Sequence, residues 1–440
     1  MKGVVEKLSK ILLFLLLCLI PTQLGKHFWF DWSLVLGMRI DYLSPILYLV
    51  DLVWIALLIS NLPAGRQGFK FLISNKKQIF NKKNLIILIF VVINILVAQN
   101  KWIAVYKWVR IGQLVWFGYY VFKNKNLVER MLMKVLPVWI GVESLLAIGQ
   151  IAKGGSLNGI WWWLGERSFD FNTIGIAQMS VANYGIVRAY GTFSHPNSLA
   201  GFLLVSLILW VKLKPLSPSI NSGQLPLKKG AVLVKTNFNN IYWWGVTWLG
   251  IIGIILTGSR TIWILSLISI TWLLWGNFKN IKNKGKIFFL ITIMLFCVYK
   301  IVDFNYPIGN FLGGWDENGW LKRGQLNFAS IEMFKKSPLF GVGAGNFLVN
   351  LPDYQKNNQI FWFQPVHNIG LLLLAEIGIL GLLIFNFYFF IFKTIKKIIK
   401  NNDKIMLLIL GVIFLSGMVD HYWFTLPQNM WLLALVLGVM

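Results

Sequence analysis

The chain contains few acidic residues. Its 440 residues include 16 Asp and Glu against 42 Lys and Arg, which gives a net charge of +26. Charged residues amount to 13% of the chain and hydrophobic residues to 57%, whereas about a quarter of a soluble domain is charged. No polar stretch is long enough to bury a sizeable core of its own. These shortages exclude an ordinary soluble domain and indicate a single membrane domain over residues 1–440.

Cysteine is also scarce. The two cysteines, Cys18 and Cys297, lie far apart and inside apolar runs, so we expect no structural disulfide. The chain has neither a pair of closely spaced cysteines nor two histidines at the spacing of a helical zinc site. We therefore predict no metal and no cofactor.

Twelve apolar runs are the main positive feature of the sequence. Most approach the length that a helix needs to cross about 30 Å of hydrocarbon at about 1.5 Å per residue. The first run follows a basic start, as in a secretory signal, but no small-residue cleavage site follows it, so we interpret it as a span. The sequence predicts an all-α polytopic membrane protein with about 12 transmembrane helices. The runs lie near residues 9–25, 43–62, 84–99, 102–122, 131–152, 197–211, 241–257, 260–276, 286–302, 367–392, 404–419 and 427–440.

The basic residues alternate from one connecting segment to the next. With the N-terminus inside, the predicted inner segments hold 27 Lys and Arg against three acidic residues, and the outer segments hold 12 against 10. This positive-inside bias predicts a multi-pass protein of the cytoplasmic (inner) membrane. The net charge then reflects topology and contact with anionic membrane lipids, and we expect no nucleic acid as a partner.

Two predicted outer segments are longer than ordinary connections. The first spans 153–196, and the second spans 303–366, between predicted helices 9 and 10. The second contains a helical stretch, Gly324–Lys336, and a glycine run, Gly341–Gly345, which lacks the Lys-Ser/Thr of a phosphate-binding P-loop and so predicts a turn. Long ordered connections in a compact protein are usually functional, and we expect the extracytoplasmic chemistry here.

Basic and imidazole side chains are concentrated at this predicted outer face. Arg260 opens the eighth apolar run, Arg188 precedes the sixth, and His367 with Asn368 opens the tenth. An arginine at a membrane boundary also serves as a plain interfacial anchor. Two guanidinium groups beside an imidazole would instead bind a pyrophosphate, while the imidazole accepts a proton from an incoming hydroxyl group.

Other ionisable residues allow structural explanations. His195 precedes a proline that suits the start of a helix and an asparagine that suits its cap. A structural role and a ligand-binding role for His195 are therefore both open. His421 follows Asp420 and is a candidate charge-paired histidine. Within a predicted span, Glu376 needs a partner, for which Lys107 or Arg110 is the candidate.

Four segments, taken in order, resemble the O-antigen ligase and polymerase superfamily. They are Arg188-Ala-Tyr-Gly-Thr-Phe-Ser-His-Pro-Asn-Ser-Leu-Ala-Gly201, Thr257-Gly-Ser-Arg260-Thr, Arg323 through Pro338-Leu-Phe-Gly-Val-Gly343, and Val366-His367-Asn368 with Glu376-Ile-Gly378. Each motif is short, but the ordered set is specific and covers about residues 160–385.

The resemblance implies a glycosyltransferase that uses a lipid-carrier donor. Such enzymes move a glycan from undecaprenyl pyrophosphate to a glycolipid or other envelope acceptor outside the cytoplasm, without a metal. By the same resemblance, Arg188 and Arg260 would hold the pyrophosphate and His367 would assist the acceptor hydroxyl. Arg323, His195 and Asn368 are weaker candidates for substrate binding.

Other functions remain open at this point. Within the family, ligases, polymerases and protein-glycosylating enzymes share overlapping motifs. A transporter or flippase for lipid-linked glycans would also have many helices and a basic cavity, although such proteins often contain inverted repeats that this chain does not plainly show. A purely structural scaffold would tolerate replacement of the outer arginines.

Overall fold

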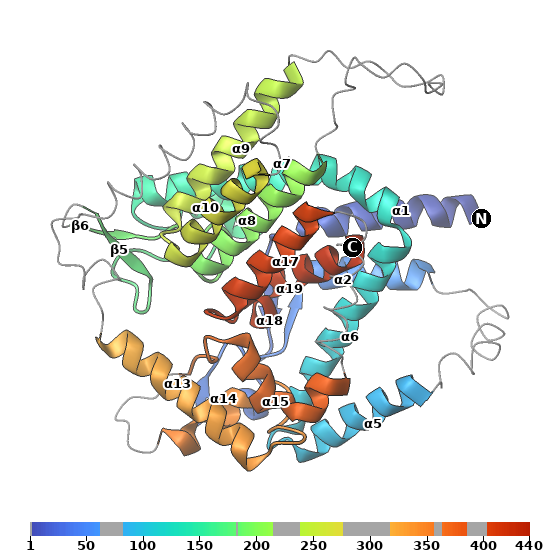
Figure 1. The fold of residues 1–440 in the computed structure, drawn as a ribbon, viewed down its shortest axis with the longest axis vertical. Coiled ribbons are helices and arrows are strands. Elements are labelled where there is room, and N and C mark those ends of the chain that lie inside the picture. The colour runs from blue at the N-terminus through green and yellow to red at the C-terminus, as the bar shows by residue number, and fades with distance from the viewer. Residues whose placement is uncertain are drawn as a thin grey trace.

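The protein is mostly helical (Figure 1). The computed structural model describes residues 2–61, 82–181, 184–213, 238–275, 317–355, 363–384 and 403–440. The helices in these residues are α1 (Lys2–Leu19), α2 (Leu49–Asn61), α5 (Lys82–Val97), α6 (Lys101–Lys123), α7 (Lys125–Lys153), α8 (Pro196–Leu213), α9 (Phe238–Leu256), α10 (Arg260–Trp275), α13 (Glu317–Lys336), α14 (Phe347–Asn350), α15 (Ile369–Ile384), α17 (Lys404–Gly417), α18 (Tyr422–Thr425) and α19 (Pro427–Val439).

The helices coincide with the apolar runs of the sequence. Every predicted run that falls on described residues contains a helix, whereas the ninth, 286–302, lies outside them. Two helices, α7 and α8, are long and apolar enough to cross a membrane, and seven shorter apolar helices accompany them in the described part of the chain. Helix α13 extends the predicted helical stretch toward the N-terminus, to Glu317.

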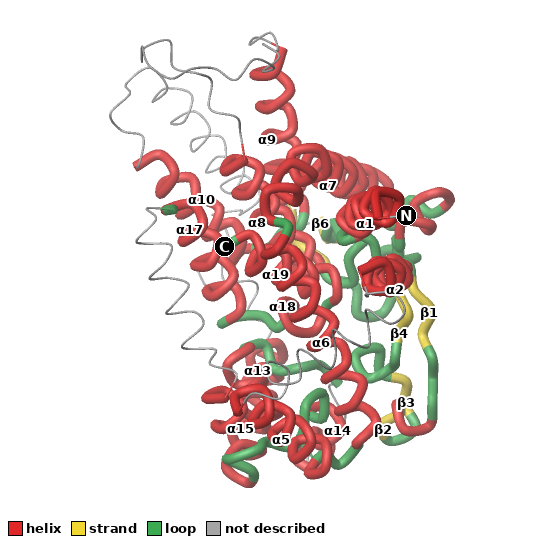
Figure 2. The backbone as a smooth tube through the Cα atoms, turned by 90° about the vertical axis from the view of Figure 1, so that its right-hand side faces the viewer, coloured by secondary structure: helices red, strands yellow, loops and turns green. Residues whose placement is uncertain are grey.

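Short strands are the departure from the all-α prediction. They form three antiparallel pairs (Figure 2). The strands are β1 (Gly25–His27), β2 (Leu34–Val35), β3 (Met38–Arg39), β4 (Ile46–Tyr48), β5 (Gln178–Val181) and β6 (Tyr184–Val187), paired β1 with β4, β2 with β3 and β5 with β6. Because residues 46–48 pair with β1, helix α2 begins at Leu49 and not at the predicted residue 43.

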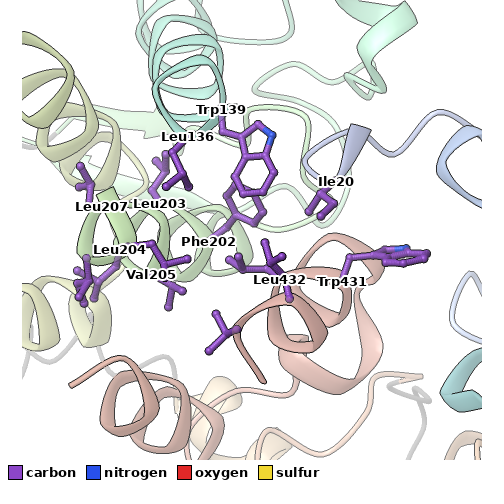
Figure 3. Close-up of a cluster of buried hydrophobic side chains, with 14 of the residues drawn as sticks. Ile20, Leu136, Trp139, Phe202, Leu203, Leu204, Val205, Leu207, Trp431 and Leu432 are labelled. Carbon is purple, nitrogen blue, oxygen red and sulfur yellow. The ribbon is translucent and has the colours of Figure 1, made fainter. Parts of the chain in front are cut away.

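The larger hydrophobic core surrounds α8, most of which is buried. Trp139 of α7 lies over Phe202 of α8 with the ring centroids 5.4 Å apart, and Trp431 and Leu432 of α19 close the same cluster (Figure 3). Small residues allow the closest helix contacts: a Cβ atom on Gly438 of α19 would lie 2.6 Å from the Gly118 carbonyl oxygen of α6.

A smaller group of helices, α5, α13, α14 and α15, lies at the other end of the molecule (Figures 1 and 2). Helix α15 is interrupted at Gly378, whose φ is 62°. The glycine turn before α14 supplies the missing backbone partners, since Val342 and Gly343 donate their N–H groups to the carbonyls of Ala375 and Glu376. Asn94 of α5 bridges both segments, because its side chain donates to the carbonyls of Phe340 and Glu376. The predicted turn at Gly341–Gly345 is thus confirmed, with positive φ at residues 341, 343 and 345.

Candidate functional site

Helix α7 fixes the backbone that carries Arg188. The side-chain oxygen of Gln150 accepts hydrogen bonds from the N–H groups of Tyr190 and Gly191, and Glu143 accepts from the N–H and hydroxyl of Thr192. A Cβ atom on Gly191 would lie 2.3 Å from the Glu143 carboxylate, so only glycine fits there. Buried polar side chains of α7 therefore hold the residues after Arg188 in one conformation.

The turn between α9 and α10 holds the Arg188 side chain. Its Nε donates to the Thr257 carbonyl oxygen at 2.6 Å, and its Nη2 donates to Oδ1 of Asn197 at 2.6 Å. Gly258 has a φ of 62°, and a Cβ atom there would lie 3.1 Å from Arg188 Nε. In the described part of the chain, Nη1 makes no hydrogen bond, so one edge of the guanidinium is available to a ligand.

Arg260 begins α10 three residues beyond Thr257 and is exposed. Burial lowers the pKa of Arg188 to about 10; the Tyr190 hydroxyl and Asp420 raise it, while the charge of Arg260 lowers it. The two guanidinium groups are thus close enough to repel each other. Arg260 makes no hydrogen bond or ion pair to the residues described. Two neighbouring cations, one with an unused edge and one without a partner, are suited to an anion that bridges them.

Asp420 lies at the centre of the site, in the corner between α17 and α18. Its Oδ2 accepts a hydrogen bond from Nδ2 of Asn197 at 2.8 Å, and its Oδ1 accepts from the N–H of His421. Nδ1 of His367 lies 3.5 Å from Oδ1, and Nε2 of His421 lies 4.0 Å from the same oxygen. Asn197 therefore connects Arg188 to Asp420, and Asp420 faces His367.

The charge states around Asp420 follow from burial. Burial alone would raise the pKa of the Asp420 carboxyl, but His367, His421 and His195 outweigh it and hold that pKa well below its usual value. Burial also lowers the pKa of His421 to about 3 and that of His195 to about 4. At neutral pH the carboxylate is ionised, and these two imidazoles are neutral.

His367 reaches this corner from the start of α15. Oδ1 of Asn368 accepts from the N–H of Leu371 and so caps α15, while its Nδ2 donates to the Met418 carbonyl at the end of α17. Asn368 thus holds the helix that carries His367 against the corner that carries Asp420. Since Nδ1 of His367 faces the carboxylate, Nε2 is the nitrogen available to a substrate.

His195 and Arg323 are the outlying members of the group. Nδ1 of His195 accepts from the N–H of Asn197, so His195 itself caps α8, whereas Asn197 was the predicted cap. Arg323 is exposed on α13, and its positive charge is among the causes that lower the pKa of His195. The structure therefore brings Arg188, His195 and His367 close to Asp420, with Arg260 beside Arg188 and Arg323 at the edge near His195.

A metal ion has one possible set of ligands in the described residues. The ligand atoms of His367, Asp420 and His421 lie within 4.8 Å of one another. One of the two nitrogens of His421 is already engaged, since its Nδ1 lies 2.6 Å from Oγ1 of Thr425. Asp420 and His421 are consecutive, but His367 comes from a distant segment, so spacing along the sequence does not indicate the full cluster.

Sequence reasoning identified the arginines and histidines but missed the residues that connect them. Asp420 was noted only as a neighbour of His421, and Asn197 only as a helix cap. One weak indication of a role for Asp420 is present in the sequence, since it is the single acidic residue of the predicted outer turn 420–426. Of the two partners predicted for Glu376, Lys107 is close enough for their charges to interact, whereas Arg110 pairs instead with Asp51 at 2.5 Å.

The fold and the site define a class: a mostly helical, apolar protein with a cluster of arginines and histidines where several helix ends meet. Residues 245–386 match the family model described as O-antigen ligase, a stretch that contains Arg260, Arg323, His367 and Asn368. This match, over about a third of the chain, confirms the predicted resemblance to the O-antigen ligase superfamily. The family consists of membrane proteins of bacterial envelope synthesis, which suggests transfer or polymerisation of lipid-linked glycans. No curated protein matches the chain.

Proposed function

We propose that this protein transfers a glycan from undecaprenyl pyrophosphate to an acceptor hydroxyl at the outer face of the cytoplasmic membrane, without a metal. The observation that carries the proposal is the hydrogen-bonded series from Arg188 through Asn197 to Asp420, which faces His367. This series joins a group suited to anion binding to a group suited to proton transfer.

The proposed reaction assigns a separate task to each group. The acceptor hydroxyl gives its proton to Nε2 of His367 as its oxygen bonds to the anomeric carbon of the donor glycan. The bond from that carbon to the pyrophosphate breaks, and the pyrophosphate leaves with the electron pair. Arg188 and Arg260 stabilise its developing charge, and Asp420 stabilises the imidazolium that forms at His367.

An apolar recess supports a lipid-linked donor. It lies between α8, α9 and α10, in the helices that lead away from the turn carrying Arg260. Its lining includes Leu204, Ile251 and Ile270, and the recess holds about 80 Å³. We propose that part of the isoprenoid chain lies along this recess while the pyrophosphate rests between the arginines. With the pyrophosphate at the outer face of the membrane, we propose that segments 153–196 and 303–366 lie outside it, above the headgroup. The whole chain would then form one membrane domain of about twelve spans.

Reconstitution tests the proposal directly. Purified protein in liposomes is supplied with a polyprenyl-pyrophosphate-linked glycan and envelope glycolipids as acceptors, and both the glycosylated product and the freed carrier are measured. We expect both to appear in equal amounts and to persist in the presence of a chelator. Translocation of an intact donor without bond cleavage would instead show a flippase, and elongation of the donor's own glycan would show a polymerase.

A further inference from the structure

A second polar space adjoins the site without containing its arginines. This cavity of about 670 Å³ lies between α6, the strand pairs of residues 25–48 and the segment from Thr425 to Trp431. Its volume falls in the range of about 300–1,000 Å³ in which proteins bind small molecules. Neither Arg188 nor Arg260 lines it, so it is separate from the proposed pyrophosphate position.

One layer of side chains separates the cavity from Asp420. The ring of Tyr42, which lines the cavity, meets the ring of His421 edge to face with the centroids 5.6 Å apart. Thr425 also lines the cavity, and its Oγ1 lies 2.6 Å from Nδ1 of His421. On another side, Ser194 lines the cavity and directly precedes His195. A ligand in the cavity would therefore lie next to the groups proposed to carry out the reaction.

The rim of the cavity combines exposed aromatic rings with exposed charges. The side chains of Arg167 and Asp41 are 53% and 61% exposed and 3.9 Å apart, so they form a loose ion pair open to the cavity. Trp162 is 51% exposed on the same rim. A lipid chain in this space would desolvate Arg167 and Asp41 without offering them a hydrogen bond, which is unfavourable.

A saccharide matches both features of the rim. Its C–H faces stack on rings such as that of Trp162, and its hydroxyl groups pair with charged side chains such as those of Arg167 and Asp41. We propose that this cavity binds the saccharide part of one of the two substrates. The inference rests on the proposed function. Donor glycan and acceptor glycan share this chemistry, and the experiment distinguishes them.

Two neighbouring tryptophans provide a matched test. Trp162 and Trp163 are consecutive and both exposed, but only Trp162 lines the cavity. The probes are the glycan released by mild acid from the source organism's polyprenyl-pyrophosphate pool, and the deacylated envelope glycolipid. Binding of each probe to wild-type protein in detergent is measured by calorimetry, and transfer kinetics are measured in liposomes. We expect Trp162→Ala to weaken binding of one probe about tenfold, with Arg167→Gln acting in the same direction and Trp163→Ala close to wild type.

The outcomes separate the inference from the proposed function. A raised KM for the donor alone assigns the cavity to the donor glycan, and a raised KM for the acceptor alone assigns it to the acceptor. If wild-type protein binds neither probe, or Trp162→Ala and Trp163→Ala behave alike, the inference is wrong even when transfer is normal. If transfer is absent but Trp162→Ala still weakens saccharide binding, the proposed reaction fails and the cavity assignment stands.

Discussion

At the scale of single residues, the account depends on Asp420 more than on any residue with a recognisable motif. Replacing Asp420 with Asn keeps the shape and the hydrogen bond from the His421 N–H, but it removes the charge that faces His367 and the oxygen that accepts from Asn197 Nδ2. We expect the transfer rate to fall about 100-fold or more, because an imidazolium at His367 would lose its counter-charge.

The control for this variant lies at the other end of the same helix. Asp403 caps α17 and pairs with Lys212 at 2.6 Å, far from His367 in the chain. Asp403→Asn should change stability but leave the turnover number near that of wild type, measured in liposomes at saturating donor. Equal turnover for Asp420→Asn and wild type would contradict the role given to Asp420.

His421 should make the folded state sensitive to acid. Burial lowers its pKa to about 3, so the folded protein leaves it neutral at a pH where the unfolded chain, with a pKa near 6.5, protonates it. The free energy of unfolding should fall below about pH 6.5, by about 1.4 kcal/mol per pH unit from this group. His421→Gln should lose less thermal stability than wild type between about pH 7 and about pH 5 in detergent. A variant with the same loss as wild type would show that His421 is not the group responsible.

At the scale of elements, the interruption of α15 depends on one glycine. Gly378 has a φ of 62°, and a Cβ atom there would lie 2.5 Å from the Leu339 carbonyl oxygen. Gly378→Ala combines backbone strain with a backbone clash, so we expect a loss of about 2–4 kcal/mol and a lower midpoint of thermal unfolding. Gly411→Ala is the control, because a Cβ atom at Gly411 meets nothing within 4 Å. A Gly378→Ala protein as stable as this control would mean that the interruption is not built as described.

The elements themselves were largely predictable from the sequence, and their connections were not. Long apolar runs identify helices such as α8, because an apolar segment of about 18 residues or more is typical of a membrane-spanning helix. The strands at residues 25–48 are two or three residues long and depend on pairing with one another, so they are too short to show a periodic pattern in the sequence. Asp420 and Asn197 meet because α8 and α17 pack side by side, so their partnership follows from tertiary structure and not from any local motif.

At the scale of the whole molecule, the orientation in the membrane can be tested by labelling. In a background where Cys18 and Cys297 are replaced by serine, single cysteines are placed at two exposed asparagines, Asn172 and Asn126. A membrane-impermeant thiol reagent added to intact cells should label Asn172→Cys but not Asn126→Cys, because the positive-inside bias places α7's first residues in the cytoplasm. The reverse pattern would put the site on the cytoplasmic side and exclude an extracytoplasmic acceptor.

The central claim is that the arginines and His367 form one site with separate tasks. The most direct measurement compares polyprenyl pyrophosphate binding with glycan transfer in Arg260→Ala and His367→Gln, each checked for a wild-type unfolding midpoint. We expect Arg260→Ala to lose both affinity and transfer, and His367→Gln to bind the carrier as wild type does while transfer is lost. A His367→Gln protein that transfers glycan at the wild-type rate, or an Arg260→Ala protein with unchanged affinity for the carrier, would contradict the account.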